Sequence, residues 1–243
     1  MSQAKISRIE TGKTLATVTD VERILRALDV PADVGREILS LTRAANVDYV
    51  SARSLARIGT WRRQLELKSL IEASSVSRQF LPAIPSGLIQ TRDYATHAMT
   101  PMVSGTPEFD VTRAVDARME LRTVIEDESR SFVLLMTEQA VRWQRAGREI
   151  MAGQLAHMIE VAQRPNVEVA IVPVDAEVHG TPVNIFVIHD DRLVTVEIFN
   201  GALSFRDPRD VGYYIEIFEF FLAHALRDSE AIEFLRRVTA DFM

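Results

Sequence analysis

The sequence contains no cysteine, which excludes a disulfide framework, a thiolate metal site and a cysteine nucleophile. No N-terminal stretch has the basic-then-apolar pattern of a signal peptide, and no apolar run reaches the ~18 residues that mark a membrane span. We therefore expect a cytoplasmic protein that makes no membrane contact. Aromatic residues are few, at 7%, but the apolar fraction of 47% is typical of a soluble globular protein.

Motifs for cofactor and metal chemistry are also lacking. The chain has no phosphate-binding Walker motif, no nucleophile elbow and no dinucleotide fingerprint. Its acidic residues and histidines do not follow metal-ligand spacings. We therefore predict that the protein uses no cofactor and no metal ion.

Charge is unevenly distributed along the chain. The net charge is −6, yet residues 1–64 hold eleven Lys and Arg against seven Asp and Glu, a balance of +4. The remaining residues consequently carry −10. A basic N-terminal quarter on an acidic body indicates a segment that faces nucleic acid, attached to a part with another task.

Residues 2–13 carry the clearest functional motif. Ile6 and Ile9 are spaced to share one face of a short helix, and Gly12 supplies the left-handed residue that ends it. The string Ser7-Arg8-Ile9-Glu10-Thr11-Gly12-Lys13 closely resembles the recognition helix of the xenobiotic-response-element (Cro/repressor-like) family of helix-turn-helix domains.

The resemblance implies a set of DNA contacts. In such domains the start of the recognition helix meets base edges and its flanks meet phosphates. Carried over by position, the base-facing residues are Gln3, Ala4 and Ser7, and the phosphate contacts are Lys5, Arg8 and Lys13. The family normally has two further helices before this point, so we expect a truncated head.

Periodicity beyond the motif predicts the fold class, which is mixed α+β or α/β. Helical spacing continues to about residue 45, and we predict a helix-turn-helix head over 1–45, a linker over 46–58 and an α/β body over 59–243. In the body, strands at 131–136 and 167–173 flank a helix at 150–161, which predicts a parallel, right-handed βαβ unit. Two further strands are expected at 183–188 and 193–199, joined by a hairpin turn over His189 to Arg192. A short extended piece at 202–205 leads into a long apolar helix, predicted from Val211 to Leu226. A long helix is predicted over 109–128 with Arg113, Arg118 and Arg122 on its outer face.

The body resembles a second family. The segment 84–95, Ile-Pro-Ser-Gly-Leu-Ile-Gln-Thr-Arg-Asp-Tyr-Ala, is similar to the Pro-Gly-Leu-Leu-Gln-Thr motif of a C-terminal domain of unknown function found in actinobacterial helix-turn-helix regulators, with a Ser inserted. Shorter matches lie at 137–140, 153–155, 169–173 and 196–197. The resemblance implies a body that senses a ligand or binds a small partner protein, as in antitoxin-like pairs.

An enzyme is the alternative hypothesis. Glu138 follows the first predicted strand, Glu197 lies in a later one, and His179 occupies a glycine-containing loop. Catalytic groups of open α/β sheets gather beyond the carboxyl ends of strands, so these three could perform acid–base chemistry. In that case the helical head would be scaffold or an RNA-facing patch.

The favoured prediction is a DNA-binding transcription regulator. Its body would bind a small molecule or a small partner protein, and ligand occupancy would change the spacing of two heads on a palindromic site. We expect a homodimer, because of that symmetry and because the segment Tyr213 to Leu226 is apolar on several sides. A third hypothesis is an antitoxin-like protein that chiefly sequesters its partner.

Overall fold

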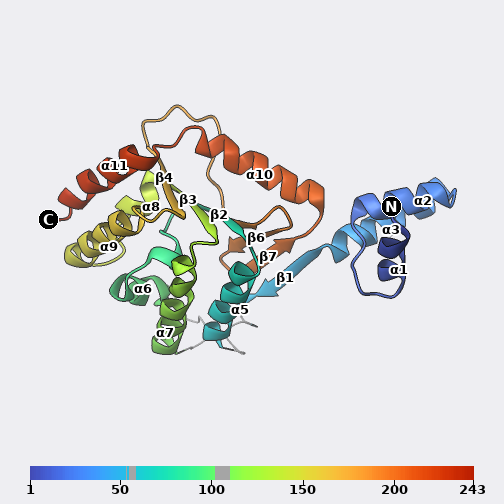
Figure 1. Ribbon diagram of the computed structural model, residues 1–243, viewed down its shortest axis with the longest axis horizontal. Coiled ribbons are helices and arrows are strands. Elements are labelled where there is room, and N and C mark those ends of the chain that lie inside the picture. The colour runs from blue at the N-terminus through green and yellow to red at the C-terminus, as the bar shows by residue number, and fades with distance from the viewer. Residues whose placement is uncertain (53, 55–58, 102–109) are drawn as a thin grey trace.

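A computed structural model of the chain describes residues 1–52, 54, 59–101 and 110–243. Three helices form a small head: α1 (Gln3–Glu10), α2 (Val18–Ala27) and α3 (Ala32–Ala45). The head lies to one side of a larger α/β body (Figure 1). The predicted fold class is confirmed: an N-terminal helical part precedes a mixed-sheet body flanked by helices.

A sheet of seven strands forms the centre of the described body, in the order β1-β7-β6-β5-β2-β3-β4. The strands are β1 (Val47–Ser51), β2 (Val76–Leu81), β3 (Ser131–Thr137), β4 (Val167–Val172), β5 (Ile185–His189), β6 (Leu193–Ile198) and β7 (Gly201–Phe205). Strands β2, β3 and β4 pair in parallel, and the other pairs are antiparallel.

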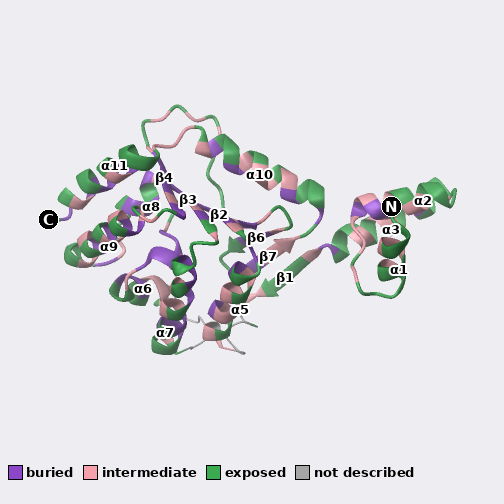
Figure 2. Ribbon diagram, in the orientation of Figure 1, coloured by how far each residue is buried: buried purple, intermediate pink, exposed green. Residues whose placement is uncertain are grey.

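Helices cover both faces of this sheet because successive strand residues point to opposite sides. One face carries α5 (Thr60–Glu72), α6 (Arg92–Met99), α7 (Val111–Arg122), α9 (Arg148–Val161) and α11 (Asp228–Ala240). The other is covered by α10 (Pro208–Leu222). The short elements η1 (Gly87–Ile89), η2 (Thr123–Glu126) and α8 (Glu138–Arg142) complete the described body. Buried residues follow the same division, concentrating in the strands and the helix faces against them (Figure 2).

The predicted βαβ unit is present as β3, α9 and β4. Phe132 pairs with Val167 in a parallel register that continues to Thr137 and Val172. Strands β5 and β6 form the expected antiparallel hairpin, in which Ile185 lies opposite Glu197. The apolar helix predicted from Val211 onward is α10, and it packs Phe218 and Phe221 into the core.

Three features differ from the sequence-based expectations. Within the interval 46–58, where we predict a linker, Val47–Ser51 form the edge strand β1, because β7 supplies backbone hydrogen-bond partners about 150 residues away in sequence. Strand β2 lies in a segment for which no strand is predicted. Helix α7 begins at Val111, and the first predicted residue of that helix, Phe109, lies outside the described residues.

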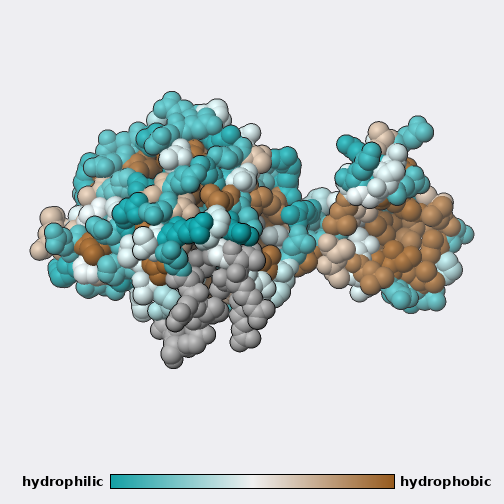
Figure 3. Space-filling view, turned by 90° about the horizontal axis from the view of Figure 1, so that it is seen from below, coloured by the Kyte–Doolittle hydropathy of each residue, from teal (hydrophilic) through white to brown (hydrophobic). Residues whose placement is uncertain are grey.

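The head has little interior of its own. Its helices bury only Val18, Asp20 and Gly35 fully. Figure 3 shows a continuous hydrophobic surface over the head, where Leu28 and Leu41 are 69% and 65% exposed. Within the described ranges, no helix combines the length and apolarity needed to cross a bilayer.

Candidate functional site

Helix α1 has the local structure that its sequence indicates. The Ser2 hydroxyl accepts the Lys5 backbone N–H at the N-terminus, and Gly12 has a positive φ of 67° just past the C-terminus. The side chains predicted to meet DNA are exposed, except for that of Lys5; the exposed ones are Gln3, Ala4, Ser7, Arg8 and Lys13. The helix therefore presents a continuous polar surface.

Lys5 is half-buried and bonds to a neighbouring helix of the head. Its Nζ donates to the Asp20 carboxylate at 2.7 Å, and Asp20 also accepts the backbone N–H of Thr17 in a capping box. Burial acts to raise the pKa of Asp20, but the hydrogen bonds from Lys5 and Thr17 outweigh it, so the pKa lies below its ordinary value. Lys5 therefore joins α1 to α2, and its ammonium is less available to a phosphate than the exposed guanidinium of Arg8.

Asp207 links the head to the body. One carboxylate oxygen accepts the backbone N–H of Val18 at 3.2 Å, and the other accepts the Arg209 backbone N–H at 2.9 Å. The same buried side chain thus lies at the start of α2 in the head and of α10 in the body. Surface ion pairs from Arg206 to Asp48 and from Arg209 to Glu22 flank it.

The three candidate acid–base residues are not brought together. Glu138 starts α8, accepts the Val174 backbone N–H at 2.8 Å and bonds Arg142 at 2.5 Å. It lines a cavity of about 340 Å³ beside Val174 and Phe221. His179 is exposed in the segment after β4, and Glu197 lines a different cavity.

Strand order explains the separation of Glu138 and Glu197. Glu197 lies in β6 and Glu138 follows β3, and because β5 and β2 lie between them these two strands are about 14 Å apart laterally. The carboxylate of Glu138 is already bonded to neighbouring groups. This geometry does not favour the enzyme alternative. In the described part of the chain, moreover, no group of three or more His, Asp and Glu could hold a metal ion.

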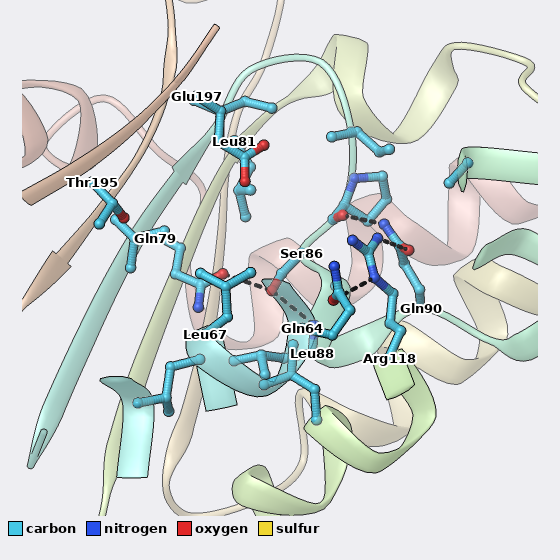
Figure 4. Close-up of a pocket in the computed structure, with 18 of the residues that line it drawn as sticks. Gln64, Leu67, Gln79, Leu81, Ser86, Leu88, Gln90, Arg118, Thr195 and Glu197 are labelled. Atoms are coloured by element: carbon cyan, nitrogen blue, oxygen red, sulfur yellow. Dashed lines mark hydrogen bonds between the residues drawn. The ribbon is translucent and has the colours of Figure 1, made fainter. Parts of the chain in front are cut away.

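A cavity of about 220 Å³ lies between the sheet and helices α5 and α7 (Figure 4). Its apolar wall comes chiefly from Leu67, Ile71, Leu81, Ile84, Leu88, Ile185 and Val187. Its polar side chains are Gln64, Gln79, Ser86, Gln90, Arg118, His189, Thr195 and Glu197. An apolar pocket with a few convergent polar groups is the usual form of a small-molecule site.

The loop that carries the second sequence resemblance forms one wall of this cavity. The Ser86 hydroxyl donates to Gln79 Oε1 at 2.6 Å and accepts the Leu88 backbone N–H, which starts η1. The Gln90 amide donates to the Pro85 carbonyl at 2.8 Å. Gln154, in the matched segment 153–155, accepts the Thr91 N–H and donates to the Ile89 carbonyl, both at 2.7 Å. These bonds fasten the loop to β2 and α9.

The side chain of Arg118, in α7, packs against this loop. The prediction that Arg118 lies on the outer face of its helix is therefore wrong. Its guanidinium donates from Nη1 to Gln90 Oε1 at 2.8 Å and from Nε to Gln64 Oε1 at 3.2 Å. A Cβ at Gly87 would lie 3.3 Å from that guanidinium. The absence of a side chain at Gly87 therefore leaves room for the guanidinium of Arg118. Desolvation lowers the pKa of Arg118, and the negative charge of Glu197 partly opposes this effect.

His189 lies in the wall of the same cavity, at the end of β5. Only 3% of its surface is exposed, and its Nδ1 has no hydrogen-bond partner among the described residues. Burial lowers the pKa of His189 to about 4; Asp190 opposes the shift and Arg63 adds to it. The imidazole is therefore neutral at pH 7.

Sequence reasoning missed most of this cavity. It assigned Arg118 to the exposed face of a helix and His189 to a hairpin turn. It proposed no role for the three glutamines that line the cavity, Gln64, Gln79 and Gln90. Glu197 is the one candidate residue that the cavity contains. The available signal was the segment 80–91, where two prolines and a glycine interrupt an apolar stretch and predict a fixed, partly buried turn.

Two family models match the chain. The model of a domain of unknown function, DUF5753, matches residues 65–237, and that of a helix-turn-helix domain matches residues 1–39. The helix-turn-helix match includes α1, α2 and part of α3. The DUF5753 match includes most of the sheet and all of the cavity lining except Gln64. No curated protein sequence matches this chain.

Solved structures show weak overall similarity. The archaeal chromatin protein TrmBL2 is 13% identical with a TM-score of 0.40, over 85% of this chain and 66% of that one. NucT from Helicobacter pylori is 12% identical with a TM-score of 0.42, and the match covers 74% of this chain and 97% of NucT. Nuc from Salmonella typhimurium, a phospholipase D family member, is 11% identical with a TM-score of 0.38, and the match covers 68% of this chain and 89% of Nuc.

Proposed function

The chain belongs to the DUF5753 family of domains of unknown function, and on that premise we propose that it is a cytoplasmic DNA-binding transcription regulator whose body binds a small-molecule ligand. The head, residues 1–45, contacts DNA. The body, residues 59–243, holds the ligand in the cavity between the sheet and helices α5 and α7. The observation that carries the proposal is the exposed polar face of α1 within a matched helix-turn-helix segment.

Helix α1 acts as the recognition helix. Gln3, Ala4 and Ser7 face base edges in the major groove, where a Gln amide can bond adenine at two atoms. Arg8 and Lys13 bind phosphates. Lys5 has a mainly structural role because its ammonium is bound to Asp20.

The connection between cavity and head runs through the sheet. Thr195 and Glu197 of β6 line the cavity, β6 pairs with β7, and β7 pairs with β1. Strand β1 follows α3 of the head almost directly. A ligand that moves β6 therefore acts on the attachment of the head, so that ligand binding and DNA binding are coupled reciprocally.

Two copies bind one operator. Helix-turn-helix dimers place their recognition helices about one DNA turn apart on a palindromic site. The head has a hydrophobic surface (Figure 3) and exposes Leu28 and Leu41. Apolar surface of this kind is a suitable contact between copies, because large exposed apolar patches mark interaction sites. A small partner protein, as in antitoxin-like pairs, would compete for exposed apolar surface of this kind.

The test is selection of duplexes from a random-sequence pool by the full chain, followed by affinity measurement at two salt concentrations. We expect a selected sequence to bind at least ten-fold more tightly than unselected DNA, with affinity falling as salt rises. The double variant Gln3→Ala/Arg8→Ala should lose at least ten-fold in affinity.

The control is Arg236→Ala, which removes the same charge from the exposed surface of α11 in the body. It should bind as the unaltered chain does. Failure to select any sequence, or equal loss in the control, would contradict the proposal.

A further inference from the structure

The cavity places opposite charges on facing walls. Glu197 projects from β6 and Arg118 from α7, and both side chains point toward the space between them (Figure 4). Among the ion pairs of the described residues, none joins the two groups within 4.0 Å. Glu197 is nevertheless close enough for its charge to act on the pKa of Arg118. A gap of this kind between a guanidinium and a carboxylate fits a molecule that has both charges.

The positive wall is organised to hold an anion. The Nε and Nη1 atoms of Arg118 are oriented by the side-chain oxygens of Gln64 and Gln90, and no partner is found for Nη2 within the described ranges. Gln64 uses its oxygen for Arg118, which leaves its amide N–H groups as donors in the same wall. Arginine with a neighbouring amide donor matches the planar geometry of a carboxylate.

The negative wall is simpler. Glu197 is exposed and makes no ion pair with another described residue, so its carboxylate can accept hydrogen bonds from an ammonium group. A ligand that is only an anion would be repelled by Glu197, and one that is only a cation would be repelled by Arg118. Charge complementarity therefore selects against both.

The space between the charged walls is small and apolar. A cavity of about 150 Å³ holds benzene, so about 220 Å³ corresponds to on the order of nine non-hydrogen atoms. Leu67, Leu81 and Val187 provide surface for an aliphatic group of that size. The lining also includes neutral His189, which adds no charge at pH 7.

We propose that this cavity binds a free α-amino acid with a short aliphatic side chain, in its zwitterionic form. The carboxylate bonds Arg118 Nη2 and the Gln64 amide, the ammonium bonds Glu197, and the side chain packs on Leu67, Leu81 and Val187. The inference rests on the proposed function, since it names the ligand class to which the regulator responds.

The experiment measures binding by isothermal titration calorimetry with the full chain. The probes are L-leucine, 4-methylpentanoate, which lacks the ammonium, and 3-methylbutylamine, which lacks the carboxylate. We expect L-leucine to bind at least ten-fold more tightly than either single-charge compound. Equal binding of 4-methylpentanoate, or no binding of any aliphatic amino acid at millimolar concentration, would overturn the proposal.

Variants test which charged group of the ligand each wall of the cavity binds. Glu197→Gln, at an exposed position, should weaken L-leucine at least ten-fold and leave 4-methylpentanoate unchanged or tighter. Arg118→Lys keeps the positive charge but loses the planar donors, and should weaken both compounds. Glu177→Gln, an exposed carboxylate after β4, is the matched control and should change neither. An L-leucine affinity that is unchanged in Glu197→Gln would overturn the assignment of the ammonium.

DNA binding is measured on the same preparations without amino acid. If the chain selects DNA through Gln3 and Arg8 but binds no amino acid, the ligand assignment fails and the regulator proposal stands. If it binds L-leucine but selects no DNA, the ligand assignment stands and the regulator proposal fails.

Discussion

The carboxylate of Asp207 accepts the backbone N–H of Val18, although the two residues are 189 positions apart in sequence. Asp207 also begins α10 by accepting the Arg209 N–H. One carboxylate therefore serves a head helix and a body helix at once. Because Asp207 is 3% exposed and Val18 is 1% exposed, this junction is shielded from water.

Asp207→Ala is expected to loosen the head as well as shorten α10. Loss of an N-terminal cap costs about 1 kcal/mol of stability, and the Val18 N–H would in addition lose its buried acceptor. Hydrogen exchange at the start of α2 should quicken. The control is Asp110→Ala, which removes the cap of α7 at an exposed position away from the head. Equal exchange at Val18 in both variants would show that Asp207 does not hold the head.

Gly87→Ala tests the space that the cavity loop leaves for Arg118. The new Cβ would lie 3.3 Å from the guanidinium, so Arg118 must move and its bond to Gln90 would weaken. We expect a loss of about 1 kcal/mol in unfolding free energy, measured by urea denaturation.

Gly153→Ala is the counterpart in α9, where a Cβ meets nothing within 4 Å. It should be neutral or stabilise the chain by up to about 1 kcal/mol, because alanine is the better helix former. If Gly87→Ala stabilises the chain as much as Gly153→Ala does, the Arg118 guanidinium does not pack tightly against position 87.

His189 should make stability depend on pH. Its pKa is about 4 in the folded chain and 6.5 when unfolded, so the unfolded state binds the proton first as pH falls. The stabilisation is complete above pH 6.5 and is lost progressively down to pH 4, by about 3 kcal/mol.

The measurement is urea unfolding between pH 7 and pH 4 for the unaltered chain, His189→Leu and His179→Gln. The unaltered chain should lose about 3 kcal/mol more than His189→Leu over this range. His179 is exposed, so His179→Gln should follow the unaltered chain. Parallel curves for all three proteins would contradict the shift at His189.

Self-association is expected to depend on the hydrophobic surface of the head. Leu28→Ser combined with Leu41→Ser removes two side chains that are more than 60% exposed, and should shift the chain from dimer to monomer in sedimentation equilibrium. Phe199→Ser alters a 97% exposed side chain in the body and should leave the dimer intact. A monomeric unaltered chain would contradict the homodimer.

Local patterns in the sequence predicted the elements whose partners lie close in the chain. The β3–α9–β4 unit and the β5–β6 hairpin have apolar strands joined by short connections, and both were expected. Strand β1 escaped prediction because most of its side chains are exposed on both faces and its partner β7 is remote in sequence. Strand β2 contains Ser77, Arg78 and Gln79, and this polar run gives no strand pattern in the sequence. Gln79 is polar at a buried position because it lines the cavity.

The candidate site was less predictable than the fold. Helical spacing places Arg118 opposite the core face of α7, and nothing local indicates that a loop some thirty residues earlier covers it. The glutamines come from separate elements that only the tertiary structure brings together. By contrast, the polar face of α1 follows from twelve consecutive residues, and its exposure could be anticipated.

Strand β1 gives the attachment of the head a stepwise character. Five consecutive residues, Val47 to Ser51, pair with β7 in one register. In this antiparallel pair the N–H and C=O groups of alternate β1 residues point to β7, so the ladder re-forms only after a shift of two residues, or about 6.8 Å. The head can therefore change its position along the sheet edge by slipping in discrete steps or by unzipping as a unit, and a gradual slide along that edge is not available to it.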